Sequence, residues 1–174
     1  LKITDNGLKS LKCWEKMAVF DFAGEFKCTL DTKNRVNIPS NLRKLFTPDA
    51  ENTLVITRGF EGINLYAYPL NEWQRLTKLL RTLNPLEKKT RDFIRQFVGV
   101  AFYAPLDSQG RTMVPERILN IGKIEKDLLI IGSLTKLEIW NPDIYNKYLT
   151  EDNLSLSDLA EQISFTDMFY EKGD

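Results

Sequence analysis

The sequence predicts an α+β fold made of two copies of one small unit, and three observations support this prediction. The segment LDTKNRVNIP at residues 30–39 returns as LDSQGRTMVP at residues 106–115, and an internal repeat of this kind constrains the architecture of a chain. Apolar and polar residues alternate on both sides of each copy, as they do in half-buried strands. The 174 residues are 43% apolar, which is enough for two halves that share one core.

Each copy of the motif is expected to form a strand, a tight turn and a second strand. Residues 26–30 and 36–38 alternate in polarity, which indicates two strands that face a core. Between them, Asp31 can accept hydrogen bonds from backbone N–H groups further along the turn. Asn34, and Gly110 in the second copy, tolerate a positive φ angle. The sequence therefore predicts a hairpin in each half.

The remaining elements follow in the same order in both halves. The proline that ends each motif favours a short helix after it, at residues 40–46 and 116–121, because proline suits the first turn of a helix. The later strands expected are residues 54–57, 63–68, 128–131 and 137–141, and the later helices expected are residues 69–83, 85–98, 142–149 and 155–165. Asn71 and Ser157 are the residues expected to cap two of these helices.

The repeat divides the chain into four segments. Residues 1–16 are weakly patterned and are interpreted as a flexible N-terminal extension ahead of Met17. Residues 17–98 hold the first repeat with two helices, and residues 99–150 hold the second repeat. Residues 151–174 form an acidic C-terminal helix and tail.

Composition excludes several classes of function. Lysine plus arginine equals aspartate plus glutamate, 24 each, so no long-range field favours an anionic partner, although a local basic face is compatible with this balance. The chain has no histidine, which removes the commonest general base and most zinc sites. No apolar run approaches the ~18 residues of a membrane span, and no signal-peptide pattern is present. The sequence therefore predicts a cytoplasmic protein with no catalytic residue, cofactor, metal, membrane or small-molecule substrate.

The candidate binding residues lie in and after the two turns. Arg35 and Arg111 leave the turns in the same direction, and a guanidinium held on a rigid turn suits phosphate or guanine. Lys33 adds a second cation to the first turn, and Asn37 is a candidate reader of adenine. The alternative is that Asp31 and Arg35 only pair across their own turn. For the aspartates we favour this structural role, because a carboxylate that faces phosphate would be repelled.

The doubled motif, together with other short segments, resembles the MraZ family. These segments are GEF at residues 24–26, TRGF at 57–60, YPLNEW at 68–73 and LEIW at 137–140, and the resemblance covers roughly residues 17–149. It implies an AbrB-like fold, in which two pseudo-repeated swapped-hairpin units form a small β-barrel-like core with flanking helices. The chain departs from the family pattern at Asn34, where glycine is usual, at Gln109, which matches Lys33, and in the leader before Met17.

The resemblance also implies a function. Members of the family are sequence-specific DNA-binding transcriptional regulators of the division and cell-wall gene cluster. They bind short direct repeats on double-stranded DNA, assemble into rings of eight or more subunits and associate with the nucleoid. Their DNA-contacting residue is the arginine of each D-x-x-x-R motif, which corresponds here to Arg35 and Arg111.

Two other functions stay open on the sequence. In an aspartyl hydrolase, Asp31-Thr32 and Asp107-Ser108 would act as the D-T/S-G pair whose carboxylates share a proton, but neither pair is followed by glycine. In a structural or partner-binding ring, the arginines would only form salt bridges, and the helices at 69–83 and 85–98 would contact other proteins. The aromatic residues assigned to the core or to subunit interfaces are Phe22, Phe26, Phe60 and Phe102.

Overall fold

The computed structural model describes residues 21–151 and 155–163, which fall into two units. The first unit runs to Asn141 and holds every strand that the structure describes. The second unit begins at Pro142 and contains two helices. The extension expected at residues 1–16 lies outside the described residues.

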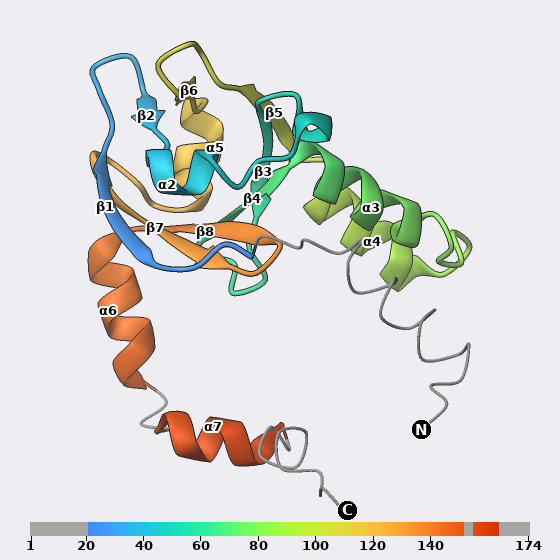
Figure 1. Cartoon of the computed structure of the whole chain (residues 1–174). Coiled ribbons are helices and arrows are strands. Elements are labelled where there is room, and N and C mark those ends of the chain that lie inside the picture. The colour runs from blue at the N-terminus through green and yellow to red at the C-terminus, as the bar shows by residue number, and fades with distance from the viewer. Residues whose placement is uncertain (1–20, 152–154, 164–174) are drawn as a thin grey trace, which may run out of the picture. The chain divides into compact units, whose positions relative to one another are not determined.

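A six-stranded antiparallel sheet forms the centre of the first unit (Figure 1), with the strand order β1-β7-β8-β4-β3-β5. Its strands are β1 (Glu25–Thr29), β3 (Thr53–Arg58), β4 (Leu65–Pro69), β5 (Phe102–Pro105), β7 (Asp127–Ser133) and β8 (Lys136–Trp140). Among the described residues this sheet is open, because its outer strands β1 and β5 do not pair with each other. The expected β-barrel-like core is therefore not closed, since both outer strands lead into turns and a separate ribbon.

That ribbon is a second, two-stranded sheet of β2 (Arg35–Asn37) and β6 (Arg111–Met113). The strands on either side of each turn were expected to pair as a hairpin, but they diverge after the turn. β1 pairs with β7 of the second half, and β5 pairs with β3 of the first half. The strands of the two halves are thus exchanged, and neither half completes a sheet from its own residues.

Helices pack against the sheet, mainly beside β3 and β4. The short helices are η1 (Pro48–Ala50), α2 (Ser40–Arg43) and α5 (Glu116–Ile121), and the long ones are α3 (Leu70–Leu80) and α4 (Lys88–Phe97). Figure 1 shows α3 and α4 beside β3 and β4. The prediction that Asn71 caps α3 is wrong, because β4 ends at Pro69 and the helix begins at the next residue. No described helix combines the length and apolar character needed to cross a membrane.

Two apolar clusters hold the first unit together. The main cluster contains residues of both halves; its members that are 0% exposed are Leu54, Ile56, Leu65, Ala67, Ala104, Ile118, Ile130 and Leu137. The smaller cluster contains Trp73 and Phe97 and lies between the sheet and α3 and α4. The Thr57 hydroxyl donates to the Phe97 carbonyl and so ties β3 to the end of α4. Phe22 lies in the main core as expected, and Phe26 and Phe102 pack against it.

The second unit consists of α6 (Pro142–Glu151) and α7 (Leu156–Gln162). Ser155, and not Ser157 as expected, caps α7. Its hydroxyl accepts from the Asp158 N–H, and the Asp158 carboxylate accepts from the Ser155 N–H. This reciprocal capping starts the helix two residues earlier than the predicted cap.

Removal of a buried side chain from β8 tests the shared core. Leu137 is 0% exposed, and we expect Leu137→Ala to lower the free energy of unfolding by about 2–5 kcal/mol, because it leaves a cavity. Leu134, in the turn before β8, is 65% exposed, so Leu134→Ala should cost about 0.5 kcal/mol or less. Urea unfolding at one fixed protein concentration measures both. Equal losses would contradict a core shared by the two halves.

Candidate nucleic-acid interface

Asp31 organises the first turn. Its Oδ1 accepts hydrogen bonds from the backbone N–H groups of Lys33 at 2.8 Å and Arg35 at 3.0 Å. Its Oδ2 accepts from the Arg35 guanidinium, through Nε at 2.7 Å and Nη2 at 2.7 Å. The expectation that the aspartate forms the turn is confirmed.

The second turn repeats this geometry. Oδ1 of Asp107 accepts from the N–H groups of Gln109 and Arg111, both at 2.9 Å. Its Oδ2 accepts from Nε of Arg111 at 2.9 Å and from Nη2 at 2.8 Å. Asn34 and Gly110 take φ angles of 54° and 79°, as the turn requires. Asparagine therefore replaces glycine in the first turn without changing its form.

Hydrogen bonds to the ionised carboxylates lower the pKa of both aspartates. The pKa of Asp31 falls to about 2, mainly through the backbone N–H of Arg35. The pKa of Asp107 is also lowered, mainly through the backbone N–H of Arg111. Both groups are therefore ionised at neutral pH, which removes the shared proton that an aspartyl hydrolase needs.

The register of the ribbon decides which side chains face solvent. Arg35 lies opposite Met113, and Asn37 lies opposite Arg111. Because side chains alternate along strands, directly opposed residues share a face. Between them, Val36 and Thr112 are 1% and 2% exposed and face the core. The outward face consists of Arg35, Asn37, Arg111 and Met113.

Backbone hydrogen bonds hold each turn against the other half of the chain. The Ile38 N–H donates to the Gly110 carbonyl at 2.9 Å, and the Val114 N–H donates to the Asn34 carbonyl at 2.9 Å. Figure 1 shows the two turns side by side at one end of the first unit. The two guanidinium groups are therefore held on a common support.

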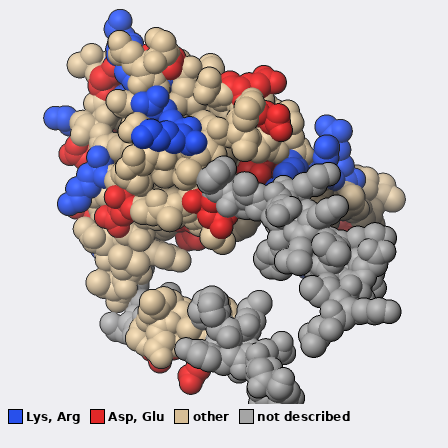
Figure 2. All heavy atoms as spheres, in the orientation of Figure 1, with Lys and Arg blue, Asp and Glu red and all other residues tan. Residues whose placement is uncertain are grey.

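The structure brings the predicted residues together on one side of the molecule. The side chains of Arg35 and Arg111 are each 32% exposed, so neither guanidinium is buried in the core. Lys33 is exposed in its turn, and Asn37 is exposed on the ribbon. On the face in Figure 2, lysine and arginine side chains run from the turns towards α2. The sequence analysis missed Met113, although it occupies the position in the second motif that Asn37 occupies in the first.

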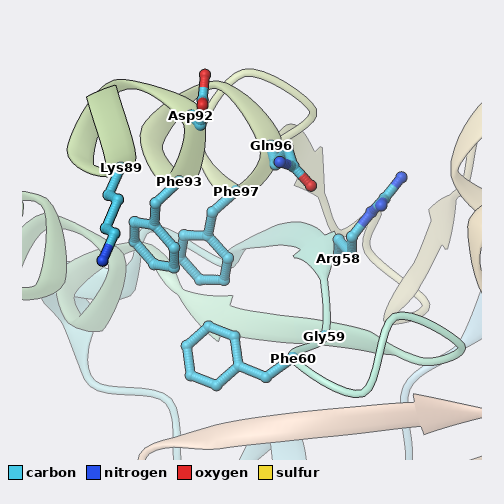
Figure 3. A pocket seen from close by; sticks show the side chains of 8 residues that line it. All are labelled: Arg58, Gly59, Phe60, Lys89, Asp92, Phe93, Gln96 and Phe97. Atoms are coloured by element: carbon cyan, nitrogen blue, oxygen red, sulfur yellow. The ribbon is translucent and has the colours of Figure 1, made fainter.

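A hollow, called here the aromatic hollow, lies away from the ribbon, between α4 and the turn after β3 (Figure 3), with a volume of about 400 Å³. Three aromatic rings line it. The centroid of Phe60 is 5.5 Å from that of Phe97 and 6.2 Å from that of Phe93. Phe60 is 68% exposed and Phe93 is 37% exposed. Phe60 is therefore not a core residue, whereas the alternative that it lies at a subunit interface stays a prediction.

These observations describe a two-repeat α+β protein in which strands of one half pair with strands of the other, and in which a shared ribbon lies between two aspartate–arginine turns. A family model described as "MraZ protein, putative antitoxin-like" matches residues 22–96 and again residues 97–164. The chain belongs to the MraZ family, which confirms the resemblance seen in the sequence.

Two relatives carry the name of this family. A protein of Clostridium beijerinckii named "Transcriptional regulator MraZ" is 39% identical over 143 residues, which cover 82% of this chain and 96% of the relative. A protein of Christiangramia forsetii with the same name is 32% identical over 151 residues, which cover 87% of this chain and 97% of the relative. The similarity thus extends over nearly the whole of each relative.

Titration of the turn aspartates tests the site geometry. The folded pKa of Asp31 lies below its ordinary value of 3.8, so the ionised carboxylate stabilises the turn above about pH 4 and loses this effect as the pH falls towards 2. A pH titration that follows the NMR chemical shift of the Asp31 carboxyl ¹³C should have its midpoint at a pH of about 2. In Arg35→Gln the midpoint should rise only in part, because the backbone N–H remains. This geometry would be contradicted if the Asp31 midpoint were near 3.8 in the unaltered protein, or if it returned fully to 3.8 in Arg35→Gln.

Proposed function

We propose that this chain is a DNA-binding transcription regulator that contacts the major groove with the outward face of its ribbon. The observation that carries the proposal is the register that brings Arg35, Asn37 and Arg111 to one exposed face. The major groove of B-DNA admits a two-stranded ribbon, and there arginine pairs with guanine and asparagine with adenine. Lys33, exposed in the first turn, supplies a phosphate contact.

Pairing with aspartate does not prevent an arginine from binding DNA. A guanidinium has five N–H donors, and the aspartate occupies the edge formed by Nε and Nη2. The edge formed by Nη1 and Nη2 stays available for a bidentate contact to the O6 and N7 atoms of guanine. Because Asp31 and Asp107 already fix the two side chains, binding costs less conformational entropy.

A single ribbon offers few contacts, and the net charge of the chain is zero. We therefore propose, on the family resemblance, a ring of eight or more subunits that presents several ribbons to short direct repeats. Linked binding sites raise the affinity without new contacts. The proposed target is the DNA upstream of the division and cell-wall gene cluster, and the proposed location is the nucleoid in the cytoplasm.

The exchange of β1 and β5 between the halves supports an AbrB-like swapped-hairpin relation between the two repeats. We propose residues 17–98 and 99–150 as these repeats, with residues 151–174 as a C-terminal helix and tail. No catalytic role is proposed for either turn.

The aromatic hollow supports the ring. Its exposed Phe60 and Phe93 are accompanied by other exposed apolar side chains on α3 and after it, which are Leu79, Leu83 and Leu86. Exposed apolar patches of this kind mark protein contacts. The same surface favours the second candidate function, a partner-binding ring that does not bind DNA. The role of the arginines separates the two candidates.

Substitution of the arginines tests DNA binding. Arg35→Gln and Arg111→Gln keep the backbone bonds of the turns but remove the proposed guanine contacts. We expect each to weaken binding to a duplex from upstream of the protein's own gene by about ten- to a hundredfold, measured by fluorescence anisotropy. Arg75, an exposed residue of α3 paired with Glu72, is the control, and Arg75→Gln should bind as the unaltered protein does. Unchanged binding by the double variant, with the oligomer intact, would favour the partner-binding ring.

Substitution of Phe60 tests the proposed subunit contact. Phe60→Ser removes the most exposed ring of the hollow, so we expect the oligomer to dissociate at concentrations at which the unaltered protein stays assembled. Sedimentation velocity measures the mass, and circular dichroism verifies the fold. Leu134 is similarly exposed, at 65%, in the turn after β7, and Leu134→Ser should leave the mass unchanged. An unaltered protein that is monomeric at every concentration would contradict the ring.

A further inference from the structure

A polar cavity of about 470 Å³ lies between α2 and the second turn, next to the ribbon. It is distinct from the aromatic hollow and is lined by parts of both halves. The polar residues of its wall are Ser40, Arg43, Lys44, Asn52, Asp107 and Ser108. Two of these are cations from the first half, and neither belongs to the aspartate–arginine turns.

Arg43 reaches across from α2 to the second turn. Its Nε donates to the Ile38 carbonyl at 2.9 Å. A Cβ atom added to Gly110 would lie only 2.3 Å from this Nε. The guanidinium therefore lies directly against the backbone of the second turn, and a glycine at position 110 leaves the space for it.

Several side-chain hydrogen-bond donors around the cavity have no partner among the described residues. Within residues 21–151 and 155–163, neither Nη group of Arg43 makes a hydrogen bond or an ion pair. The same holds, in this described part of the chain, for the Lys44 ammonium and for the hydroxyl groups of Ser40 and Ser108. Four side chains that line one cavity, from two elements, thus carry donors without a partner in the described residues.

The charge of the cavity wall is positive despite the presence of Asp107. The carboxylate of Asp107 is bound by the Arg111 guanidinium and by two backbone N–H groups, so its charge is compensated. Arg43 and Lys44 carry charges that nothing in the described structure balances. Several donors around two positive charges suit an anion with several oxygens, and phosphate is the biological anion of this kind that arginine and lysine bind.

The second half has no equivalent cavity wall. The residues of α5 and its end that match Ser40, Arg43 and Lys44 are Glu116, Leu119 and Asn120. Leu119 is buried, and Glu116 would repel an anion. Arg43 and Lys44 therefore lie on one side of the ribbon, although its two strands come from equivalent positions of the two repeats.

We infer that this cavity binds a phosphate group, which in the DNA-bound protein is a backbone phosphodiester beside the ribbon. The identification of this phosphate as part of DNA rests on the proposed function, whereas the phosphate site itself does not. One flank of the ribbon then contacts the DNA backbone through this site, and the other flank does not. Each chain gains a direction on the duplex, which suits repeats that all point the same way.

Lys44→Asn tests this inference, because it introduces the residue that the second half carries at the matching position. Two duplexes are compared: the upstream duplex, and the same duplex with its repeats scrambled. A phosphate contact carries no sequence information, so we expect Lys44→Asn to weaken binding to both by about tenfold. The slope of log Kd against log salt should fall by about 0.9 for each bound chain.

Two controls separate this result from other causes. Lys123 is an exposed lysine just after α5 whose φ of 50° asparagine tolerates, so Lys123→Asn should leave both affinities unchanged. Arg35→Gln should reduce binding to the upstream duplex more than to the scrambled one, because it removes a base contact. An unaltered protein that binds neither duplex would overturn the proposed function, while the phosphate site is still tested by a second measurement.

That second measurement titrates the full chain with inorganic phosphate and follows the backbone amides of Lys44, Ser108 and Gly110 by NMR. Shifts that disappear in Lys44→Asn support the site. The phosphate-induced shifts could also occur while Lys44→Asn binds both duplexes normally. The site would then bind a small phosphorylated molecule, and the inference that its phosphate comes from DNA would be wrong. Weaker binding to both duplexes without such shifts supports the duplex as the source. No shifts together with unchanged DNA binding would overturn the inference.

Discussion

Each of the two turns is anchored by backbone hydrogen bonds to the other half of the chain. Ile38 bonds the Gly110 carbonyl, and Val114 bonds the Asn34 carbonyl, so each turn takes its place only when the other half is present. The β2–β6 ladder lies between these bonds and has one register. A slip of one residue would turn the arginines towards the core, where an unpaired charge is strongly disfavoured. The same backbone bonds that join the halves thus determine what the ribbon presents to solvent.

The aspartate–arginine pair reconciles two interpretations that are alternatives when only the sequence is considered. As a structural element, the aspartate holds the turn through two backbone N–H groups and one edge of the guanidinium. In the proposed DNA contact, the same pairing fixes the guanidinium and leaves its Nη1–Nη2 edge available for a base. Neither role competes with the other, because each occupies a different set of donors on the same side chain. The low pKa of the carboxyl keeps this arrangement charged and intact at neutral pH.

The two halves share a backbone but differ in surface chemistry. Asn34 and Gly110 both adopt a positive φ angle, and the two turns have the same aspartate-to-backbone hydrogen bonds although their residues differ. The cations do not repeat: Lys33 is matched by Gln109, and Lys44 by Asn120. A symmetric backbone with unequal charges gives the chain a direction, as a binding protein needs if its copies are to align head to tail along a polymer. The zero net charge is consistent with this, because local clusters and not the total decide where an anion binds.

The turns and the residues that form them could be predicted from the sequence, since they depend on contacts within a few residues of one another, and the family could be predicted from the motifs. Asp31 as an acceptor and Asn34 at positive φ could be predicted because an aspartate reaches backbone groups two and four residues on. The sequence did not predict that the strands beside each turn pair with the other half, that the sheet stays open, that Phe60 is exposed or that Arg43 lies against the second turn. Strand pairing depends on which distant residues bury the most apolar surface together, and that quantity belongs to the whole core and not to any segment of the chain.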